Sequence, residues 1–358
     1  MKHIFEQVTV GGILSPNRLI RSATQEGLAD ERGSVGHELI SVYKALSIGG
    51  SGIIISSMVG IDENSRVFPY MIKAYGDDCV DGMRHLVNAV HSNGGKLVVQ
   101  LAHCGAKACP DDGSQPLAPS DISMGEKSAR NMTKEEINKL AESFAQAALR
   151  CREAGADGVQ IHAAHGYLLS EFLSPFFNKR EDEYGGDIAN RARIIFEVYE
   201  AVRNKVNNNY PIWIKINCED FVDGGFTFDE CQWVCRELDK RGINALEISG
   251  GLSVSPESSA TRKTADGNGK GHFSDQALVI AENVKATVIS VSGYRTPQMI
   301  EQALNIGRIE AVSLCRPLIS EPGLPNIWKN ESPRPSRCVS CNKCFDFKSG
   351  FGCKVFHD

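Results

Sequence analysis

The stretch Gly52-Ile53-Ile54-Ile55-Ser56 is the clearest indication of the fold class. It places three isoleucines in a row with no polar residue between them, and isoleucine favours extended backbone. A short apolar run of this kind is typical of a strand that is buried on both faces. Such strands form parallel sheets covered by helices, so we expect an α/β protein.

Similar runs alternate with segments of helical periodicity along the chain. The expected strands cover residues 17–23, 52–56, 96–101, 158–162, 212–217, 245–249, 288–291 and 311–314. Helices are expected at 133–154, 190–206 and 227–241. At the start of the first, Thr133 and Glu136 form a capping box, and Gly155 after it marks the end of the helix. Eight strands alternating with helices close most simply as a (β/α)8 TIM barrel. An open doubly wound sheet is the competing fold, but no Gly-x-Gly-x-x-Gly motif opens a first strand–helix unit.

Three segments lie outside this alternation. Residues 8–14 predict a hairpin with a Gly11-Gly12 turn, which we expect to plug the bottom of the barrel. The segment 104–132 is rich in Gly, Pro, Asp and Ser, and we expect a long insertion after the third strand, on the catalytic face. Five prolines between 317 and 335 predict an extended tail without another helix. We therefore divide the chain into a barrel, residues 1–330, and a cysteine-rich C-terminal tail, residues 331–358.

The composition of the 358 residues excludes several classes of protein. A net charge of −5 gives no reason to expect nucleic acid or a membrane surface as a partner. No apolar run approaches the roughly 20 residues that span a bilayer, and the N-terminus lacks the apolar stretch of a signal peptide. We therefore expect a cytoplasmic enzyme, in which free thiols are the usual state of cysteine.

Two histidines and a tyrosine follow the fourth expected strand, at His162, His165 and Tyr167. Residues at the C-terminal ends of barrel strands gather around one mouth. We expect the imidazole N–H groups to donate to a substrate carbonyl oxygen and the phenol to supply a proton. The alternatives are a histidine pair with only local hydrogen bonds and a pair of metal ligands.

The seventh and eighth strands run into Gly293 and Arg316. A glycine lets backbone N–H groups approach a phosphate, and an arginine can bind the same phosphate in a bidentate manner. The loops after these two strands are the recurrent phosphate site of such barrels. The alternative for Gly293 is a simple turn.

Two polar residues lie on strands that are otherwise apolar. Lys215 needs an anionic partner, which is either a ligand such as a reduced flavin or a barrel carboxylate such as Glu247. Gln100 offers a donor and an acceptor, as the edge of an amide-rich ring would require. The alternative for Gln100 is a glutamine that only caps its strand.

Several of these residues lie within longer motifs. Residues 100–105 read Gln-Leu-Ala-His-Cys-Gly and fit the pattern Gln-Leu-x-His-x-Gly, and the segment around the two histidines continues to Pro175. Further motifs are Asn178-Lys179-Arg180, Asp182-Glu183-Tyr184-Gly185-Gly186, and Asn190-Arg191 followed by Arg193. In these motifs, and from about residue 5 to residue 322, the chain resembles the old yellow enzyme family.

The resemblance implies an oxidoreductase with FMN at the barrel mouth. NAD(P)H would reduce the flavin, and an α,β-unsaturated carbonyl compound would reoxidise it, as in an ene-reductase. His162 and His165 would bind the substrate carbonyl, and Tyr167 would protonate Cα. The residues implied to hold FMN are Ala23, Thr24, Gln25 and Met58 along the ring, Gln100 and Lys215 at its pyrimidine edge, and Gly293, Cys315 and Arg316 at its phosphate. The resemblance also implies a homo-oligomer.

The chain departs from the family pattern near the expected flavin ring. It has Glu26, which brings a carboxyl group close to the redox centre, and Gly27, which removes a side chain that relatives often use there. Ala106 stands where the His-x-Gly motif is commonly followed by arginine. These changes leave flavin binding intact and bear on the substrate and on the redox potential.

Four of the twelve cysteines lie in the tail, at Cys338, Cys341, Cys344 and Cys353. Thiolates at such short spacings can bind one metal centre, either a [4Fe–4S] cluster or a zinc ion. The alternatives are reduced thiols without a metal and a disulfide that fastens the tail. The placement resembles the cluster-bearing branch of the family, that of 2,4-dienoyl-CoA reductase and trimethylamine dehydrogenase, although the spacing there is wider.

Three other functions compete with the ene-reductase. The first is an FMN dehydrogenase or demethylase that passes electrons through a tail cluster to an external acceptor. The second is a phosphate-binding barrel lyase or aldolase without flavin, in which Lys215 forms a Schiff base. The third is a non-catalytic, redox-sensing protein that keeps FMN.

Overall fold

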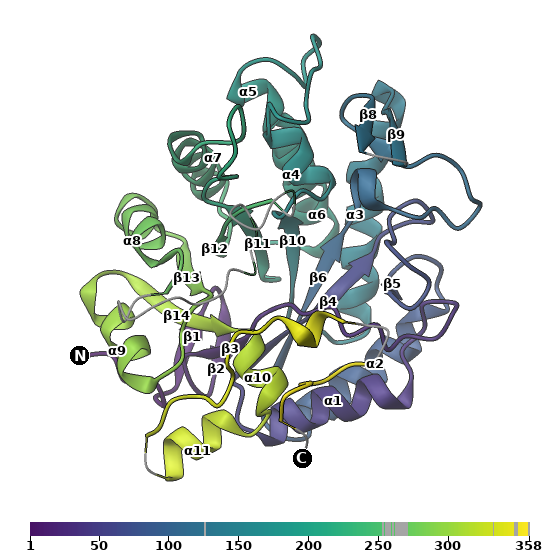
Figure 1. Ribbon diagram of the computed structural model, residues 1–358. Coiled ribbons are helices and arrows are strands. Elements are labelled where there is room, and N and C mark those ends of the chain that lie inside the picture. Colours follow the sequence, from purple (N-terminus) through teal and green to yellow (C-terminus); the bar gives the residue numbers. More distant parts are fainter. Residues whose placement is uncertain are drawn as a thin grey trace.

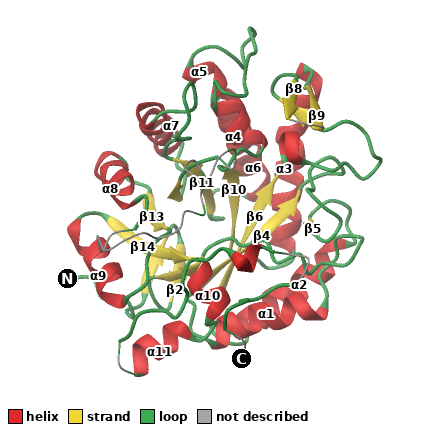
Figure 2. Ribbon diagram, viewed as in Figure 1, coloured by secondary structure: helices red, strands yellow, loops and turns green. Residues whose placement is uncertain are grey.

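The computed structural model describes the chain except for residues 125–126, 253, 255–258, 260, 262–270, 332, 347–349 and 357–358. Eight parallel strands follow one another around a closed barrel (Figures 1 and 2). They are β3 (Leu19–Arg21), β4 (Ile53–Gly60), β6 (Lys96–Ala102), β10 (Gly158–Ala163), β11 (Ile212–Asn217), β12 (Ala245–Ser249), β13 (Thr287–Val291) and β14 (Ile309–Leu314). The barrel closes because β3 pairs with both β14 and β4. The (β/α)8 barrel predicted from the sequence is therefore confirmed.

Helices surround the barrel. They are α1 (His37–Ile48), α2 (Cys79–His91), α3 (Lys134–Glu153), α4 (Leu168–Leu173), α5 (Ile188–Arg191), α6 (Arg193–Val206), α7 (Phe228–Lys240), α8 (Ser274–Asn283), α9 (Pro297–Ile306), α10 (Arg316–Ser320) and α11 (Leu324–Asn330). Two short helices, α4 and α10, lie at the catalytic face of the barrel. Thr133 and Glu136 form the predicted capping box at the start of α3, and Thr227 and Glu230 form another on α7. No helix in the described part of the chain is long and apolar enough to cross a membrane.

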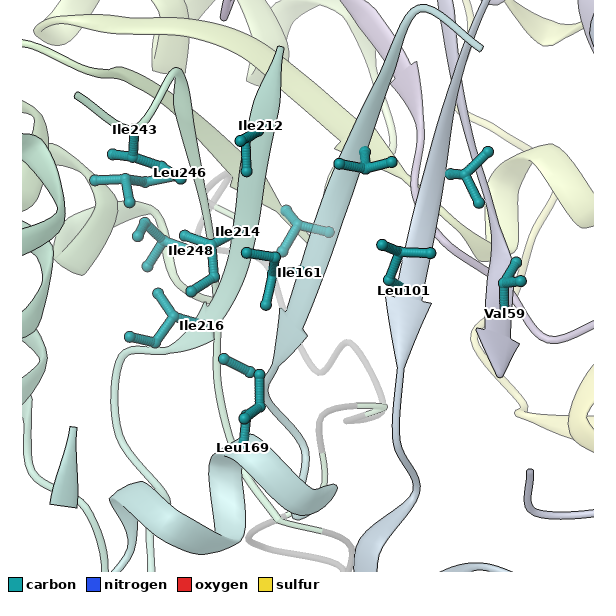
Figure 3. Close-up of a cluster of buried hydrophobic side chains, with 14 of the residues drawn as sticks. Val59, Leu101, Ile161, Leu169, Ile212, Ile214, Ile216, Ile243, Leu246 and Ile248 are labelled. Atoms are coloured by element: carbon teal, nitrogen blue, oxygen red, sulfur yellow. The ribbon is translucent and has the colours of Figure 1, made fainter. Parts of the chain in front are cut away.

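Side chains alternate between the two faces of each barrel strand, and this alternation places the site. On β11, Ile212, Ile214 and Ile216 point outward and pack in the layer between strands and helices (Figure 3). The residues between them, Trp213 and Lys215, therefore face the barrel interior. The outward set anchors the strand, so the inward set keeps a fixed position.

The bottom of the barrel is closed by the predicted hairpin, β1 (Val8–Val10) with β2 (Ile13–Ser15). Its turn residues, Gly11 and Gly12, have φ angles of +50° and +86°. The indole Nε1 of Trp213 donates a hydrogen bond of 2.9 Å to the carbonyl oxygen of Gly11. Around it, buried apolar side chains from the hairpin and from seven barrel strands fill the lower interior, including Val10 and Ile289. The hairpin thus seals the end opposite the site.

The insertion after the third barrel strand has structure of its own. Residues in 104–132 form a short 3-10 helix, Gly105–Lys107, and a small sheet of β7 (Leu117–Ala118), β9 (Lys127–Asn131) and β8 (Ile122–Met124). The sheet packs beside α4, which follows β10 at the catalytic face. This segment therefore contains regular structure although its composition is typical of a loop.

The prediction of an extended chain directly after the eighth strand was wrong. Two helices, α10 and α11, lie there, and the prolines 317 and 325 occupy the first turn of each helix. Proline is tolerated at this position because its missing N–H has no partner within the helix and its φ is already helical. The last α-helix, α11, ends at Asn330, and of the later residues that the structure describes only Lys343–Phe345 are helical, in a 3-10 turn.

The seal at the barrel bottom can be tested by comparing two glycines with positive φ. A Cβ at Gly11 would lie 2.5 Å from Nε1 of Trp213, whereas a Cβ at Gly94, φ +79°, meets no atom within 4 Å. We expect Gly94→Ala to lower the free energy of unfolding by about 1 kcal/mol, the cost of a left-handed alanine. Gly11→Ala adds a steric clash and should cost about 2 kcal/mol more. Urea unfolding measures both values, and equal losses would contradict the proposed packing.

Candidate active site

A cavity of about 390 Å³ opens at the C-terminal ends of the barrel strands. Every residue predicted from the sequence to act in catalysis or to hold the cofactor lines this cavity. These residues are Ala23, Thr24, Gln25, Met58, Gln100, His162, His165, Tyr167, Lys215, Gly293, Cys315 and Arg316. The barrel therefore brings together side chains from all parts of the sequence at one face, and the cavity is within the size range of small-molecule sites.

A chain of polar side chains crosses the barrel at the base of the cavity. Glu247 is fully buried, lies 3.2 Å from Nζ of Lys215, and accepts hydrogen bonds from Ser22 and Gln160. Gln160 in turn accepts a bond of 2.7 Å from Gln100. Lys215 also donates to Ser22 over 2.9 Å. The carboxylate predicted as the alternative partner of Lys215 is thus present, and the lysine still lines the cavity.

The two histidines lie side by side in the cavity wall. The ring centroids of His162 and His165 are 5.4 Å apart, and the rings are nearly perpendicular. Nε2 of His165 lies 2.8 Å from Oγ of Ser249, whereas Nδ1 of His162 is buried without a hydrogen-bond partner. Burial, with the charges of Lys215 and Lys107, lowers the pKa of both imidazoles, that of His165 to about 3. Both rings are therefore neutral near pH 7.

Tyr167 completes this wall, and the side chains of Lys107 and Glu171 lie behind it. Its ring centroid is 5.1 Å from that of His162, and burial raises the pKa of its phenol. Nζ of Lys107 lies 4.8 Å from the centre of the Tyr167 ring and donates to the carbonyl oxygen of His165. Glu171 is fully buried and accepts from the backbone N–H of Ala106, and burial raises its pKa to about 8. The insertion thus supports the histidine loop without lining the cavity.

The loop after β13 has the backbone geometry that a close approach to an anion requires. Gly293 has a φ of +90°, and a Cβ there would lie 2.8 Å from the backbone nitrogen of His272. Only glycine fits this position, because both the backbone angle and the neighbour exclude a side chain. Nearby, Sγ of Cys315 lies 3.2 Å from Oγ1 of Thr24. This contact connects the loop after β14 to the loop after β3.

Two arginines converge on this end of the cavity, Arg316 and Arg295. Arg316 donates over 2.8 Å to Oδ1 of Asn342, and Arg295 donates to Oγ of Ser340. Burial lowers the pKa of Arg295, and the charge of Arg316 acts in the same direction. Within the described residues neither guanidinium has a carboxylate partner. Two adjacent positive charges without a carboxylate favour an anionic ligand.

The carboxyl group of Glu26 lies behind the cavity wall and does not line the cavity. It is 3.7 Å from Nη2 of Arg21, and both side chains are buried. Burial raises the pKa of Glu26 to about 7, although the charge of Arg21 opposes this. Arg21 also donates to Oγ1 of Thr24, which does line the cavity. The charge of Glu26 therefore depends on pH. Arg21 lies between this carboxyl group and the cavity, because it pairs with Glu26 and donates to Thr24 in the cavity wall.

The four tail cysteines lie together around a second, smaller cavity, which shares Arg316 with the first. All twelve cysteines of the chain are free thiols, so the predicted alternative of a disulfide is not seen. Burial and the neighbouring Cys315 raise the pKa of Cys344 to about 12. Among the described residues no group of three or more His, Cys, Asp or Glu side chains is arranged around one metal position.

Several residues that line the cavity were not predicted from the sequence. They are Arg295, Ser313, Phe345 from the tail, Val67 and Phe68. Arg295 could have been found, since it lies two residues after the glycine of the predicted phosphate loop. The other four carry no pattern of their own, because long-range folding alone places them at the mouth.

Comparison with known proteins identifies the family. Residues 3–334 match the family described as NADH:flavin oxidoreductase / NADH oxidase. The chain belongs to this family. The prediction of an old yellow enzyme relative is therefore confirmed, and a flavin cofactor with NADH or NADPH as reductant is characteristic of the family.

Three individual proteins show how much of each chain the similarity covers. The chain is 34% identical over 351 residues to a metal reductase of Desulforamulus reducens, and the match covers 97% of this chain and 52% of that protein. A 2-naphthoyl-CoA reductase has a TM-score of 0.88 at 26% identity, and the match covers 96% of this chain and 54% of the reductase. Morphinone reductase has a TM-score of 0.78 at 26% identity, with 92% and 91% covered. The chain thus spans about half the length of the first two proteins.

The pKa of Glu26 gives a testable dependence of stability on pH. Its pKa rises from 4.5 to about 7 on folding, so between these values the folded protein binds a proton that the unfolded chain has released. The contribution of Glu26 to stability therefore falls as the pH rises through this range. Glu26→Gln removes the titration and should gain stability over the parent between pH 5 and pH 8, by up to about 3 kcal/mol.

Thermal unfolding at several pH values measures this gain. Glu31→Gln, at an exposed glutamate, is the control and should follow the parent at every pH. A stability difference between Glu26→Gln and the parent that stays constant from pH 5 to pH 8 would refute the assigned ionisation.

Proposed function

We propose that this protein is an FMN-dependent reductase that transfers hydride from NADH or NADPH, through the flavin, to the alkene of an α,β-unsaturated carbonyl compound. The observation that carries the proposal is the pair of neutral imidazoles, His162 and His165, in one cavity with a lysine at its base and two arginines at its end. The family membership, and the similarity to morphinone reductase and a 2-naphthoyl-CoA reductase, support it.

Buried polar atoms in the cavity wall support FMN as its ligand. Polar atoms of Gln25, His162 and Ser313 are buried in its wall without a hydrogen-bond partner in the described chain, so a polar ligand would satisfy them. Ala23, Thr24, Gln25 and Met58 would lie along the ring, Gln100 and Lys215 would bind its pyrimidine edge, and Gly293, Cys315 and Arg316 would bind its phosphate. FMN, when bound, supplies the hydride chemistry.

The protein's own contribution is to polarise the substrate and to supply a proton. A neutral imidazole has one N–H to donate, and His162 and His165 would direct these groups at the carbonyl oxygen, where negative charge develops. Tyr167 keeps its proton near pH 7 because burial raises its pKa, so it can protonate Cα. Lys107 donates to the carbonyl oxygen of His165, and Glu171 accepts from the backbone N–H of Ala106, so two hydrogen bonds connect the loop that carries these groups to the insertion.

The geometry at Lys215 disfavours the lyase or aldolase. A Schiff base requires a neutral amine, whereas Nζ of Lys215 lies 3.2 Å from the buried carboxylate of Glu247. That carboxylate stabilises the ammonium form. A cationic lysine suits a site that must hold the negative charge of a reduced flavin.

We propose further that the four tail cysteines, Cys338, Cys341, Cys344 and Cys353, bind a [4Fe–4S] cluster. Their position around one cavity supports this. A zinc ion needs four donors at about 2.3 Å from a single point. In a [4Fe–4S] cluster each thiolate binds a different iron, so the four sulfurs need not converge on one position.

A bound cluster would make the competing function available, in which electrons leave the flavin for an external acceptor. The cysteine cavity shares Arg316 with the first cavity, so the two proposed cofactors would lie next to each other. A cytoplasmic location, a homo-oligomer and the division of the chain at residue 330 remain predictions from the sequence.

The role of the histidine pair can be tested with a phenol, which places an oxygen anion where the substrate carbonyl would lie. His162→Ala with His165→Ala should leave FMN bound but raise the Kd of 4-hydroxybenzaldehyde at least 100-fold, because two hydrogen bonds to a charged group are lost. Changes in the visible flavin spectrum measure both values.

His85→Ala, at an exposed histidine of α2, serves as the control for this test and should bind like the parent. An unchanged phenol Kd in the double variant would refute the role of the pair. A parent protein that binds no FMN would refute the proposed function as a whole.

The tail cluster can be tested by iron analysis. The protein purified without oxygen should contain about four irons and four sulfides per chain. Cys344→Ser should lose most of this iron, whereas Cys109→Ser, at an exposed cysteine of the insertion, should keep it. One zinc per chain without sulfide would establish the zinc alternative, and a metal-free parent would refute both.

A further inference from the structure

The C-terminal tail holds the arginines at the phosphate end of the cavity. Ser340 accepts a hydrogen bond from Nη2 of Arg295, and Asn342 accepts one of 2.8 Å from Nη1 of Arg316. The backbone N–H of Ser336 donates to the carbonyl oxygen of Arg295 over 2.8 Å. Figure 1 shows the yellow C-terminal segment crossing the open end of the barrel. Each guanidinium is thus bound by a different tail side chain.

The conformation of the tail at these residues is specific. Ser340 and Asn342 have φ angles of +57° and +63°, in the left-handed region that residues other than glycine rarely adopt. Ser340 is buried, and Asn342 donates to the carbonyl oxygen of Thr261 over 2.7 Å. Both residues alternate with the tail cysteines along the chain. The fold therefore maintains two unfavourable backbone angles where the tail meets the arginines.

The arrangement around the arginines is that of an anion site. Arg295 and Arg316 face one cavity, and within the described residues the acceptors that hold their side chains are neutral oxygens, not carboxylates. A neutral acceptor orients a guanidinium and leaves its charge available to a ligand. A carboxylate at the same place would neutralise that charge.

We propose that Ser340 and Asn342 are positioning residues for the FMN phosphate, and that Arg295 binds this phosphate together with Arg316. The assignment rests on the proposed function, because it takes FMN as the ligand of the cavity. The tail then forms part of the flavin site as well as carrying the cysteines. By restricting two flexible side chains before the phosphate arrives, it lowers the entropy lost on binding.

The test compares FMN with riboflavin, which has the same ring and no phosphate. Both positions have positive φ, so glycine removes the side chain without adding backbone strain. In the full-length chain freed of bound flavin, Ser340→Gly and Asn342→Gly should each raise the Kd of FMN about tenfold, and the double variant about 100-fold. The Kd of riboflavin should not change, because the tail acts only through the phosphate.

Lys343→Gly is the matched control. It introduces a glycine into the same turn and removes an exposed positive charge, and the Lys343 side chain makes no hydrogen bond to any residue that the structure describes. It should bind both flavins like the parent. All variants are compared at equal iron content, and unchanged melting temperatures show that they remain folded.

A further variant separates orientation from charge. Asn342→Asp keeps the acceptor for Arg316 and tolerates the positive φ, but its carboxylate competes with the phosphate. Its FMN Kd should rise at least tenfold, again with riboflavin unchanged.

Two results would overturn the assignment while leaving the proposed function intact. One is an FMN Kd equal to that of the parent in the double glycine variant. The other is an equal loss of FMN and riboflavin, which would show that the tail supports the site without contacting the phosphate through the arginines. A parent that binds neither flavin would overturn the proposed function, and this assignment with it.

Discussion

A lysine and a glutamate are buried together inside the barrel, and the site depends on this pair. Burying either charge alone would cost several kcal/mol, so each residue requires the other and the hydrogen bonds around them. Glu247 binds Lys215, Ser22 and Gln160, and Gln160 binds Gln100. The pair therefore links side chains from four strands with Ser22, the residue directly after β3. Below this layer the interior is apolar, and above it lies the cavity. The pair therefore separates the part of the barrel that stabilises the fold from the part that binds ligands.

The sequence predicted the barrel because its strands are unusually regular. On β11 every second residue is an isoleucine that packs against helices, and the strand limits at 212–217 were predicted without error. The catalytic-face residues followed from the same regularity, since a barrel collects its strand ends at one mouth. The sequence therefore predicted one site for His162, Lys215 and Arg316, and the three residues line one cavity.

Other features depended on contacts between residues far apart in the chain. Prolines 317 and 325 suggested an extended chain, because proline density alone does not distinguish the first turn of a helix from its interior. Arg295 donates a hydrogen bond to Ser340, which lies 45 residues later in the chain, and no local sequence pattern predicts that contact. Glu171 lies on a short helix, where a charged residue usually faces solvent, yet it is fully buried against the insertion. Such contacts arise only when separate segments are packed together.

The position of β3 has a consequence for how the protein is made. This strand is the first of the barrel, yet one of its two partners is the last, β14, with Leu19 paired to Val312. A ribosome that synthesises the chain from its N-terminus releases β3 long before β14 exists, so the ring cannot close until nearly the whole barrel has been translated. Ser22, at the end of β3, bonds both Lys215 and Glu247, so the polar layer is complete only at that moment. The nascent chain consequently has no finished cofactor pocket during most of its synthesis, and capture of the flavin belongs to the final stage of folding.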